Sequence, residues 1–431
     1  MFFFSRKFFP FFGTFFLGAL NDNIFRYALS IMIVYQCGYT EQQSSELTFI
    51  ATALLMLPQF PFSALAGEIA DKFPQQRLFR WIKLIEVILM VLTFGAFLFK
   101  QVYVLLFLLF LMGTQSAFYS PMKYAYIPRN MPGELVRGNA YVGAWTYIAI
   151  LGGMIVGIYL IRVESCGAIL TGGVLILIAL LGYFSARSVP ELPAANPELQ
   201  ICCNPLKGAF EIIRMNFSDR IIRHCVIGLS IFWMAGALYV SQLSVFCKEV
   251  IGANEELVII FTLLFSLGVA MGALICSLIR KIANVMHFVS PALILMAVFT
   301  LDLYFASGAW KKLTDGELVG IMELIREKTF WRFVLDLVAL AACGGFYSVP
   351  VSALMQQTAG RGSVARVVAG NNIVNAFLIV AGSLGMGRLT GSGLVSIKGV
   401  FVVIAIVNVF AALYLLPLRK QDLNMKNTVK E

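Results

Sequence analysis

The feature that most constrains the fold of this chain is a series of long apolar runs that continues from one end to the other. Each run is about 20 residues long, the length that lets a helix cross the hydrocarbon core of a bilayer. Helices are expected instead of barrel strands, because lipid offers no hydrogen-bond partner to an exposed backbone group and barrel strands are only about 10 residues long. We therefore predict an all-α membrane protein with twelve transmembrane helices, over residues 8–35, 46–66, 78–99, 101–122, 136–161, 165–186, 222–246, 257–279, 284–307, 332–356, 364–387 and 395–417.

The charged residues are few, and their positions predict the orientation of the chain in the membrane. They make up 13% of the sequence, whereas a soluble domain averages about 25%. Of the 33 Lys and Arg, 20 lie in the ends and loops on one side of the predicted spans, 10 lie on the other side and three lie within spans. Because cytoplasmic loops carry the larger share of Lys and Arg, we expect both termini in the cytoplasm. Membrane topology explains the net charge of +10, and nucleic acid is not expected as a partner.

Two similar phrases divide the chain into repeated halves. "FYSP" begins at Phe118 and "FYSVP" begins at Phe346, and each is followed by a "GN" motif that carries Asn139 or Asn371. Recurrence at matching spans indicates duplication, and transporters with repeated halves bind their substrate near the middle of the membrane. We predict an N-terminal six-helix half, a cytoplasmic linker, a C-terminal six-helix half and a cytoplasmic tail, over residues 1–186, 187–221, 222–418 and 419–431.

Ionisable residues within the spans are candidates for function, because a charge at the bilayer centre costs about 2.5–3.5 kcal/mol and needs a partner or a wet cavity. Asp22 and Arg26 lie one helical turn apart, so they either neutralise each other or face a substrate. Lys123 is the one charge in either copy of the repeated phrase. It either extends to the cytoplasmic headgroups or binds a phosphate-bearing lipid. Glu86 follows Lys83 by three residues, which favours a local ion pair over a proton site.

The sequence contains no pattern typical of catalysis or of metal binding. It has no H-E-x-x-H, G-x-S-x-G or P-loop motif, so we do not expect an enzyme. The eight cysteines form no C-x-x-C pair, and the two histidines, His224 and His287, are far apart in the chain. We therefore expect no metal site, no disulfide framework and no cofactor.

The loop after the second span resembles a signature of the major facilitator superfamily. "GEIADKFPQQR" (Gly67–Arg77) follows the pattern G-x-x-x-D-[KR]-x-x-x-x-[RK] in the loop where that superfamily keeps it. The resemblance implies the major facilitator fold. It also implies that the residues at the key positions latch the two halves on the cytoplasmic side, namely Gly67, Asp71, Lys72 and Arg77.

Within that superfamily, further motifs resemble the lysophospholipid transporter family and the membrane half of fused transporter–acyltransferase–acyl-carrier ligase proteins. These motifs are "FLGALNDNIFRYAL" (Phe16–Leu29), "FYSPMKYAYIP", "GGFYSVPVSALMQQ" and "AGNNIVNAF". The resemblance implies a transporter that moves lyso-lipids, such as lysophosphatidylethanolamine, from the outer to the cytoplasmic leaflet of a bacterial inner membrane for reacylation. The expected partners are the lyso-lipid, the surrounding membrane lipids and a separate acyltransferase/acyl-carrier ligase. We expect a monomer.

Polar residues of both halves are expected to bind the lyso-lipid. They are Asp22, Asn23, Arg26, Lys123, Tyr124, Asn139, Tyr239, Gln242, Asn371 and Asn375. One departure from the family concerns the seventh span, where Val240 stands at a position that carries arginine in a family member. An alternative function is a proton-coupled exporter of a small amphipath, drug or siderophore, with Asp22 or Glu86 as the proton carrier. A protonophore would stop such an exporter.

The loop 308–332 contains a pattern typical of an amphipathic helix. Thr314 precedes Glu317 by three residues, as in a capping box. Apolar residues then follow at helical spacing: Leu318, Ile321, Met322 and Ile325. We predict a helix over Thr314–Lys328 that lies flat at the outer interface and supports a lateral opening for a single-chain lipid.

Overall fold

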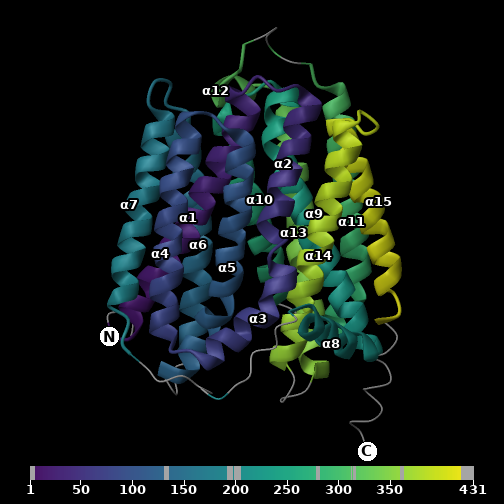
Figure 1. Cartoon of the computed structure of the whole chain (residues 1–431). Coiled ribbons are helices and arrows are strands. Elements are labelled where there is room, and N and C mark those ends of the chain that lie inside the picture. Colours follow the sequence, from purple (N-terminus) through teal and green to yellow (C-terminus); the bar gives the residue numbers. More distant parts are fainter. Residues whose placement is uncertain are drawn as a thin grey trace, which may run out of the picture. The chain divides into compact units, whose positions relative to one another are not determined.

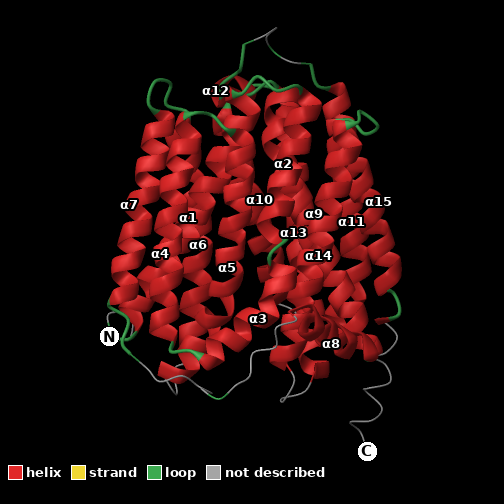
Figure 2. Ribbon diagram, in the orientation of Figure 1, coloured by secondary structure: helices red, strands yellow, loops and turns green. Residues whose placement is uncertain are grey.

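The computed structural model describes residues 5–130, 135–191, 198, 205–277, 282–311, 313, 317–359 and 364–418. Within these ranges the chain is built from helices (Figure 1, Figure 2), and its β pairing consists of one isolated bridge between Ala253 and Val319. The predicted all-α fold class is confirmed.

A helix lies in each of the ranges predicted to span the membrane. They are α1 (Phe8–Ile31) with its π-helical continuation η1 (Met32–Gln36), α2 (Glu41–Met56), α3 (Gln59–Lys72), α4 (Gln75–Leu98), α5 (Val102–Asn130), α6 (Leu135–Ile161), α7 (Gly167–Arg187), α9 (Arg220–Val245) with η2 (Phe246–Ile251), α10 (Glu255–Ser277), α11 (Ile282–Ala309), α13 (Lys328–Ala359), α14 (Val364–Gly391) and α15 (Ile397–Leu415). Two further helices are α8 (Pro205–Ser218) and α12 (Ile321–Leu324). In the described part of the chain, nine helices are long and apolar enough to cross a membrane. The count of twelve crossings stays a prediction.

The second predicted span consists of two helices instead of one. α2 ends at Met56, and α3 begins at Gln59 directly after Pro58. Proline has no N–H to donate and its ring clashes with the preceding turn, so the helix is interrupted at this point. The backbone N–H of Phe62 donates to the carbonyl of Pro58 at 3.1 Å, which starts the hydrogen bonding of α3.

Packing divides the chain into two compact units. Unit 1 contains Met1–Gly38 and Leu54–Ala209, and unit 2 contains Tyr39–Ala53 and Phe210–Glu431. Most of α2 therefore belongs to unit 2, although its sequence lies in the first repeat.

The same pairs of helices pack together in the two units. In unit 1, α1 packs on α6, α3 on α5 and α4 on α7 (Figure 1). In unit 2, α9 packs on α14, α10 on α13 and α11 on α15. The repeated phrases lie on α5 and α13, which are corresponding members of these pairs. This correspondence agrees with the duplication inferred from the sequence.

Glycines allow the closest of these helix contacts. An added Cβ at Gly157 of α6 would lie only 2.6 Å from the carbonyl oxygen of Ile24 in α1, and one at Gly153 would lie 2.7 Å from that of Leu20. In unit 2 an added Cβ at Gly272 of α10 would clash with the Ala342 carbonyl of α13. Backbones this close leave no room for a side chain, so these glycines determine how near the helices lie.

An aromatic cluster fixes the start of α1 within unit 1. Phe11 stacks on Tyr126 of α5 with ring centroids 4.3 Å apart, and it also contacts Phe79 of α4 at 6.1 Å. The Tyr126 hydroxyl donates to the backbone carbonyl of Lys7 at 2.8 Å. All three rings are almost fully buried. The cluster therefore ties α1 to both α4 and α5.

The amphipathic helix predicted over Thr314–Lys328 is wrong for most of its length. Between residues 317 and 327, the described part of this range before α13 begins at Lys328, the only helix is the single turn α12. Thr314 itself lies outside the described residues. Val319 is extended, because its N–H donates to the Gly252 carbonyl at 2.9 Å and its carbonyl accepts from the Asn254 N–H at 3.1 Å. This pairing with a distant loop overrides the local helical pattern.

Candidate functional site

α1 and α5 face each other in unit 1 along a line of polar side chains. The Ser116 hydroxyl donates to Asp22 Oδ2 at 2.8 Å, and the hydroxyls of Thr14 and Tyr119 are 2.7 Å apart. Ser116, Tyr119 and Lys123 are three or four residues apart, so they share one face of α5. Lys123 is half-buried, and its charge attracts that of Asp22. The charges of the predicted residues Asp22 and Lys123 therefore interact with each other.

The other predicted residues of α1 make contacts within their own helix. The Arg26 guanidinium lies over the ring of Tyr27, 5.6 Å from its centroid. Asn23 donates to the carbonyl of Ala19 at 2.8 Å. Among the described residues no ion pair joins Asp22 to Arg26. The structure therefore contradicts the alternative in which Asp22 and Arg26 only neutralise each other.

The two charges of α4 form the local ion pair predicted from their spacing. Lys83 Nζ donates to Glu86 Oε2 at 2.7 Å, and both residues are 1% exposed. Asn21 of α1 donates to Glu86 Oε1 at 3.1 Å, and Gln115 of α5 donates to Glu86 Oε2 at 3.2 Å. The prediction of a pair is confirmed. A carboxylate that already accepts from three donors is poorly suited to carry a proton during transport.

Several predicted residues have side chains or surroundings outside the described part of the structure. These are Tyr124 in α5, Asn139 in α6, and Gly67 and Asp71 in α3. The backbone of each lies in a helix, and their roles stay predictions. The two other latch residues are described, with Lys72 half-buried at the end of α3 and Arg77 exposed in the first turn of α4.

The predicted residues of α9 are buried inside unit 2. The Tyr239 hydroxyl is 2.5 Å from Thr300 Oγ1 of α11, and the Tyr239 side chain is 3% exposed. Gln242 Oε1 accepts from Ser45 of α2 at 2.9 Å and is fully buried. These contacts join helices of unit 2 to one another.

The predicted residues of α14 are also buried. Asn375 Oδ1 accepts from Ser230 of α9 at 2.5 Å. Asn371 is 6% exposed, and its Oδ1 atom has no hydrogen-bond partner among the described residues. The most accessible of the described substrate candidates therefore lie in unit 1.

Sequence reasoning missed Ser116, the partner of Asp22, and two of the three partners of Glu86, Asn21 and Gln115. Gln115 and Ser116 lie just before the repeated phrase, and Ser116 lies seven residues before Lys123 on the same helical face. That spacing is the signal that could have found Ser116. Gln115 and Asn21 could not be found in this way, because their common partner lies on a third helix.

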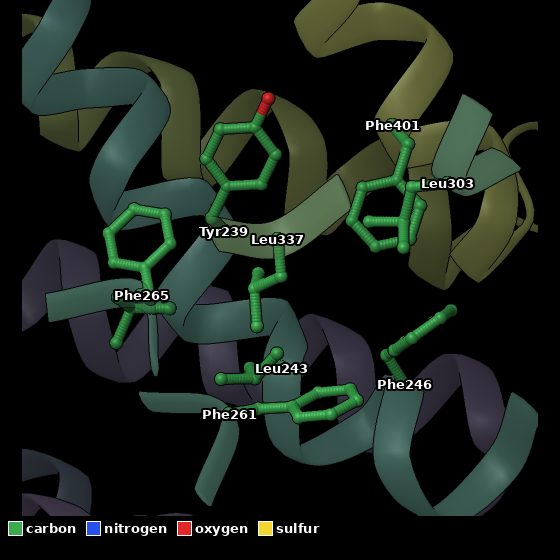
Figure 3. A pocket seen from close by; sticks show the side chains of 9 residues that line it. Tyr239, Leu243, Phe246, Phe261, Phe265, Leu303, Leu337 and Phe401 are labelled. Carbon is green, nitrogen blue, oxygen red and sulfur yellow. The ribbon is translucent and has the colours of Figure 1, made fainter. Parts of the chain in front are cut away.

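Unit 2 contains a small apolar pocket with a cavity volume of about 10 Å³ (Figure 3). Its lining side chains come from α9, η2, α10, α11, α13 and α15, and they are Tyr239, Val240, Leu243, Phe246, Phe261, Phe265, Leu303, Leu337 and Phe401. None of these side chains is charged. Val240, which stands at a position where a family member carries arginine, therefore belongs to an apolar wall.

Comparison with known families agrees with the helical architecture described above. The sequence profile of the Major Facilitator Superfamily matches residues 11–383. The chain belongs to the Major Facilitator Superfamily. Its membership of this superfamily and its apolar helices together show that the protein is a multi-pass membrane protein.

Relatives of this major facilitator include proteins named lysophospholipid transporter LplT. The protein of Serratia proteamaculans is 26% identical over 366 residues, which cover 83% of this chain and 81% of the relative. That of Photorhabdus laumondii subsp. laumondii is also 26% identical, over 80% of this chain and 78% of the relative. The similarity thus extends over most of both chains.

Solved structures support the fold of this major facilitator. A D-xylose-proton symporter superimposes with a TM-score of 0.66 at 14% identity, covering 95% of this chain and 97% of that chain. A bacterial homologue of the iron transporter ferroportin, in the inward-facing state, superimposes with a TM-score of 0.67 at 12% identity over the same shares of the two chains. At these identities the likeness concerns the fold alone.

Proposed function

We propose that this major facilitator moves lysophospholipids, such as lysophosphatidylethanolamine, across a bacterial inner membrane by alternating access. The observation that carries the proposal is the Asp22–Ser116 contact with Lys123 on the same face of α5. A carboxylate and an ammonium that attract each other complement the ammonium and phosphate of a zwitterionic headgroup. The relatives named lysophospholipid transporters support the same substrate class.

The carboxylate of Asp22 and the ammonium of Lys123 have different roles in this proposal. Asp22 receives the cationic end of the headgroup while Ser116 holds its other oxygen in place. Lys123 binds the phosphate as a compact point charge. Asn23, Arg26, Tyr124 and Asn139 are proposed to contribute further polar contacts in unit 1, and Tyr239, Gln242, Asn371 and Asn375 are the polar candidates of unit 2.

The side chains that line the unit 2 pocket are of a kind that binds hydrocarbon, although the pocket, at about 10 Å³, must open to admit an acyl chain. Its nine lining side chains carry no charge, so a headgroup would lose its hydration there without compensation. An acyl chain has no such hydration to lose, and it gains contact with five aromatic rings, those of Tyr239, Phe246, Phe261, Phe265 and Phe401.

The proposed direction of movement is from the outer to the cytoplasmic leaflet, where a separate acyltransferase/acyl-carrier ligase reacylates the product. Both termini are proposed to be cytoplasmic, as the distribution of Lys and Arg predicts. The end of α3, which contains Asp71, would then act as a cytoplasmic latch. Asp71→Asn is expected to change the distribution of distances between spin labels placed on α3 and α14, and an unchanged distribution would contradict the latch.

The test is uptake of labelled lysophosphatidylethanolamine by vesicles that contain the purified protein, with empty vesicles as the control. We expect protein-dependent movement that continues after a protonophore is added. Movement no faster than in empty vesicles would refute the proposal. Movement that stops with the protonophore would favour the proton-coupled alternative, in which Asp22 carries the proton.

A further inference from the structure

The buried ion pair of α4 is connected to the Asp22–Ser116 contact through the residues next to it. Asn21 precedes Asp22 in α1 and donates to Glu86 Oε1. Gln115 precedes Ser116 in α5 and donates to Glu86 Oε2. The Ser116 hydroxyl lies 2.8 Å from Asp22 and 3.4 Å from Gln115 Oε1. One carboxylate is therefore bonded to both helices that form the candidate headgroup site.

The protein provides a specific space for this ion pair. An added Cβ at Gly18 of α1 would lie 2.5 Å from Lys83 Nζ, and one at Gly182 of α7 would lie 3.5 Å from it. The ammonium also lies 5.6 Å from the ring centroid of Tyr119, the residue one turn beyond Ser116. Lys83 is thus enclosed by α1, α5 and α7, so Glu86 is held at one place between the helices.

The bonds to Glu86 determine how α1 and α5 are rotated. Successive residues of a helix are about 100° apart around its axis, so holding residue 21 also sets the direction of residue 22. The second amide atom of Asn21, Oδ1, is buried and has no partner among the described residues. The hydrogen bond from Asn21 Nδ2 to Glu86 is therefore the contact that holds the Asn21 side chain. Gln115 does the same for Ser116 in α5.

We propose that Lys83 and Glu86 are positioning residues that hold Asp22 and Ser116 in register for the lyso-lipid headgroup. The inference rests on the proposed function, because it assigns the pair a role in the same site. The pair itself contacts no substrate. Its two charges cancel each other within α4.

The test compares two double variants that both remove the buried charges. Lys83→Met with Glu86→Gln keeps one of the two acceptor oxygens, for either Asn21 or Gln115, whereas Lys83→Met with Glu86→Leu removes both. Removing both charges together avoids an unpaired buried charge, which is the change that most endangers folding. Thr93→Val is the matched control, because Thr93 is a buried residue of the same helix whose hydroxyl has no partner among the described residues.

Two readouts are needed. In vesicles, the Leu variant should raise the apparent KM for lysophosphatidylethanolamine about tenfold, because it removes the acceptors of both Asn21 and Gln115, with a smaller change in maximal rate. The Gln variant should raise the KM less than the Leu variant does, and Thr93→Val should stay near the wild-type KM. The second readout is the infrared band of the Asp22 carboxyl, obtained by subtracting the spectrum of Asp22→Asn in each background. This band should shift in the Leu variant and shift less in the Gln variant.

The outcomes separate the inference from the proposed function. If the wild type does not move lyso-lipid, the proposed function fails, and the infrared band still decides whether the pair positions Asp22. If both double variants match the wild type in KM and in the band, the positioning role is refuted. If the Leu variant does not fold, Gln115→Leu, which removes the link on α5 alone, should shift the same band, and an unshifted band would refute the inference.

Discussion

The contact between α1 and α6 gives the sharpest prediction about stability. Gly157→Ala adds one methyl group where α6 meets the backbone of α1. The added Cβ would lie 2.6, 3.0 and 3.2 Å from the oxygen, Cα and carbonyl carbon of Ile24. All three are backbone atoms of a helix, so none of them can rotate away.

The cost follows from these distances. Carbon atoms in contact normally stay about 3.5–4.0 Å from other heavy atoms, so α1 and α6 must separate by roughly 0.5–1 Å. Overpacking of this kind costs about 1–3 kcal/mol. Alanine also gains about 1 kcal/mol over glycine as a helix former, which partly offsets the loss.

Gly173→Ala is the matched control, because an added Cβ at Gly173 of α7 meets nothing within 4 Å. Both variants gain the same helix propensity, so the overpacking cost of about 1–3 kcal/mol should appear as the difference between them. Thermal unfolding of the purified proteins in one detergent measures this difference. Gly157→Ala should unfold at a lower temperature than Gly173→Ala, and equal temperatures would show that the helices can separate freely.

Three further predictions concern the candidate site and its surroundings. Asp22→Asn and Lys123→Ala should abolish lyso-lipid transport in vesicles while leaving folded protein in the membrane, and Lys123→Arg should retain more activity than Lys123→Met; normal transport by either of the first two variants would make that residue structural. Val240→Phe should narrow the apolar pocket and raise the KM for long-chain lyso-lipids more than for short-chain ones, with Val240→Ala as the control; an unchanged ratio would argue against the pocket as a site for the acyl chain. Arg332→Leu should lower stability by about 1 kcal/mol, because it removes the cation that pairs with Asp302 at a partly exposed position; an unchanged melting temperature would show that this ion pair contributes nothing.

Much of the fold follows from the sequence because it depends on local chemistry. Each apolar run satisfies its own backbone hydrogen bonds as a helix, so a helix was predictable wherever such a run occurs. The Lys83–Glu86 pair was predictable for the same reason, because residues three apart on a helix are neighbours whatever surrounds them. The break at Pro58 also follows from the residue itself.

The partners of the charged residues were decided only by the tertiary structure. Asp22 is one turn from Arg26 in sequence, yet it accepts from Ser116, which is 94 residues away. Val319 lies in a segment with a helical pattern, yet it is extended because it pairs with the backbone around Ala253.

The assignment of residues 39–53 to unit 2 is a decision of the same kind. This segment is bonded to α9 through Ser45 and Gln242 and through the hydroxyls of Thr52 and Ser241, which are 2.6 Å apart. Contacts between helices depend on the distance between the helix axes, on the position of each helix along its axis and on its rotation about that axis. Those quantities are set by contacts between residues far apart in the chain, such as the backbone approach of Gly157 to Ile24 and the hydrogen bonds of Asn21 and Gln115 to Glu86.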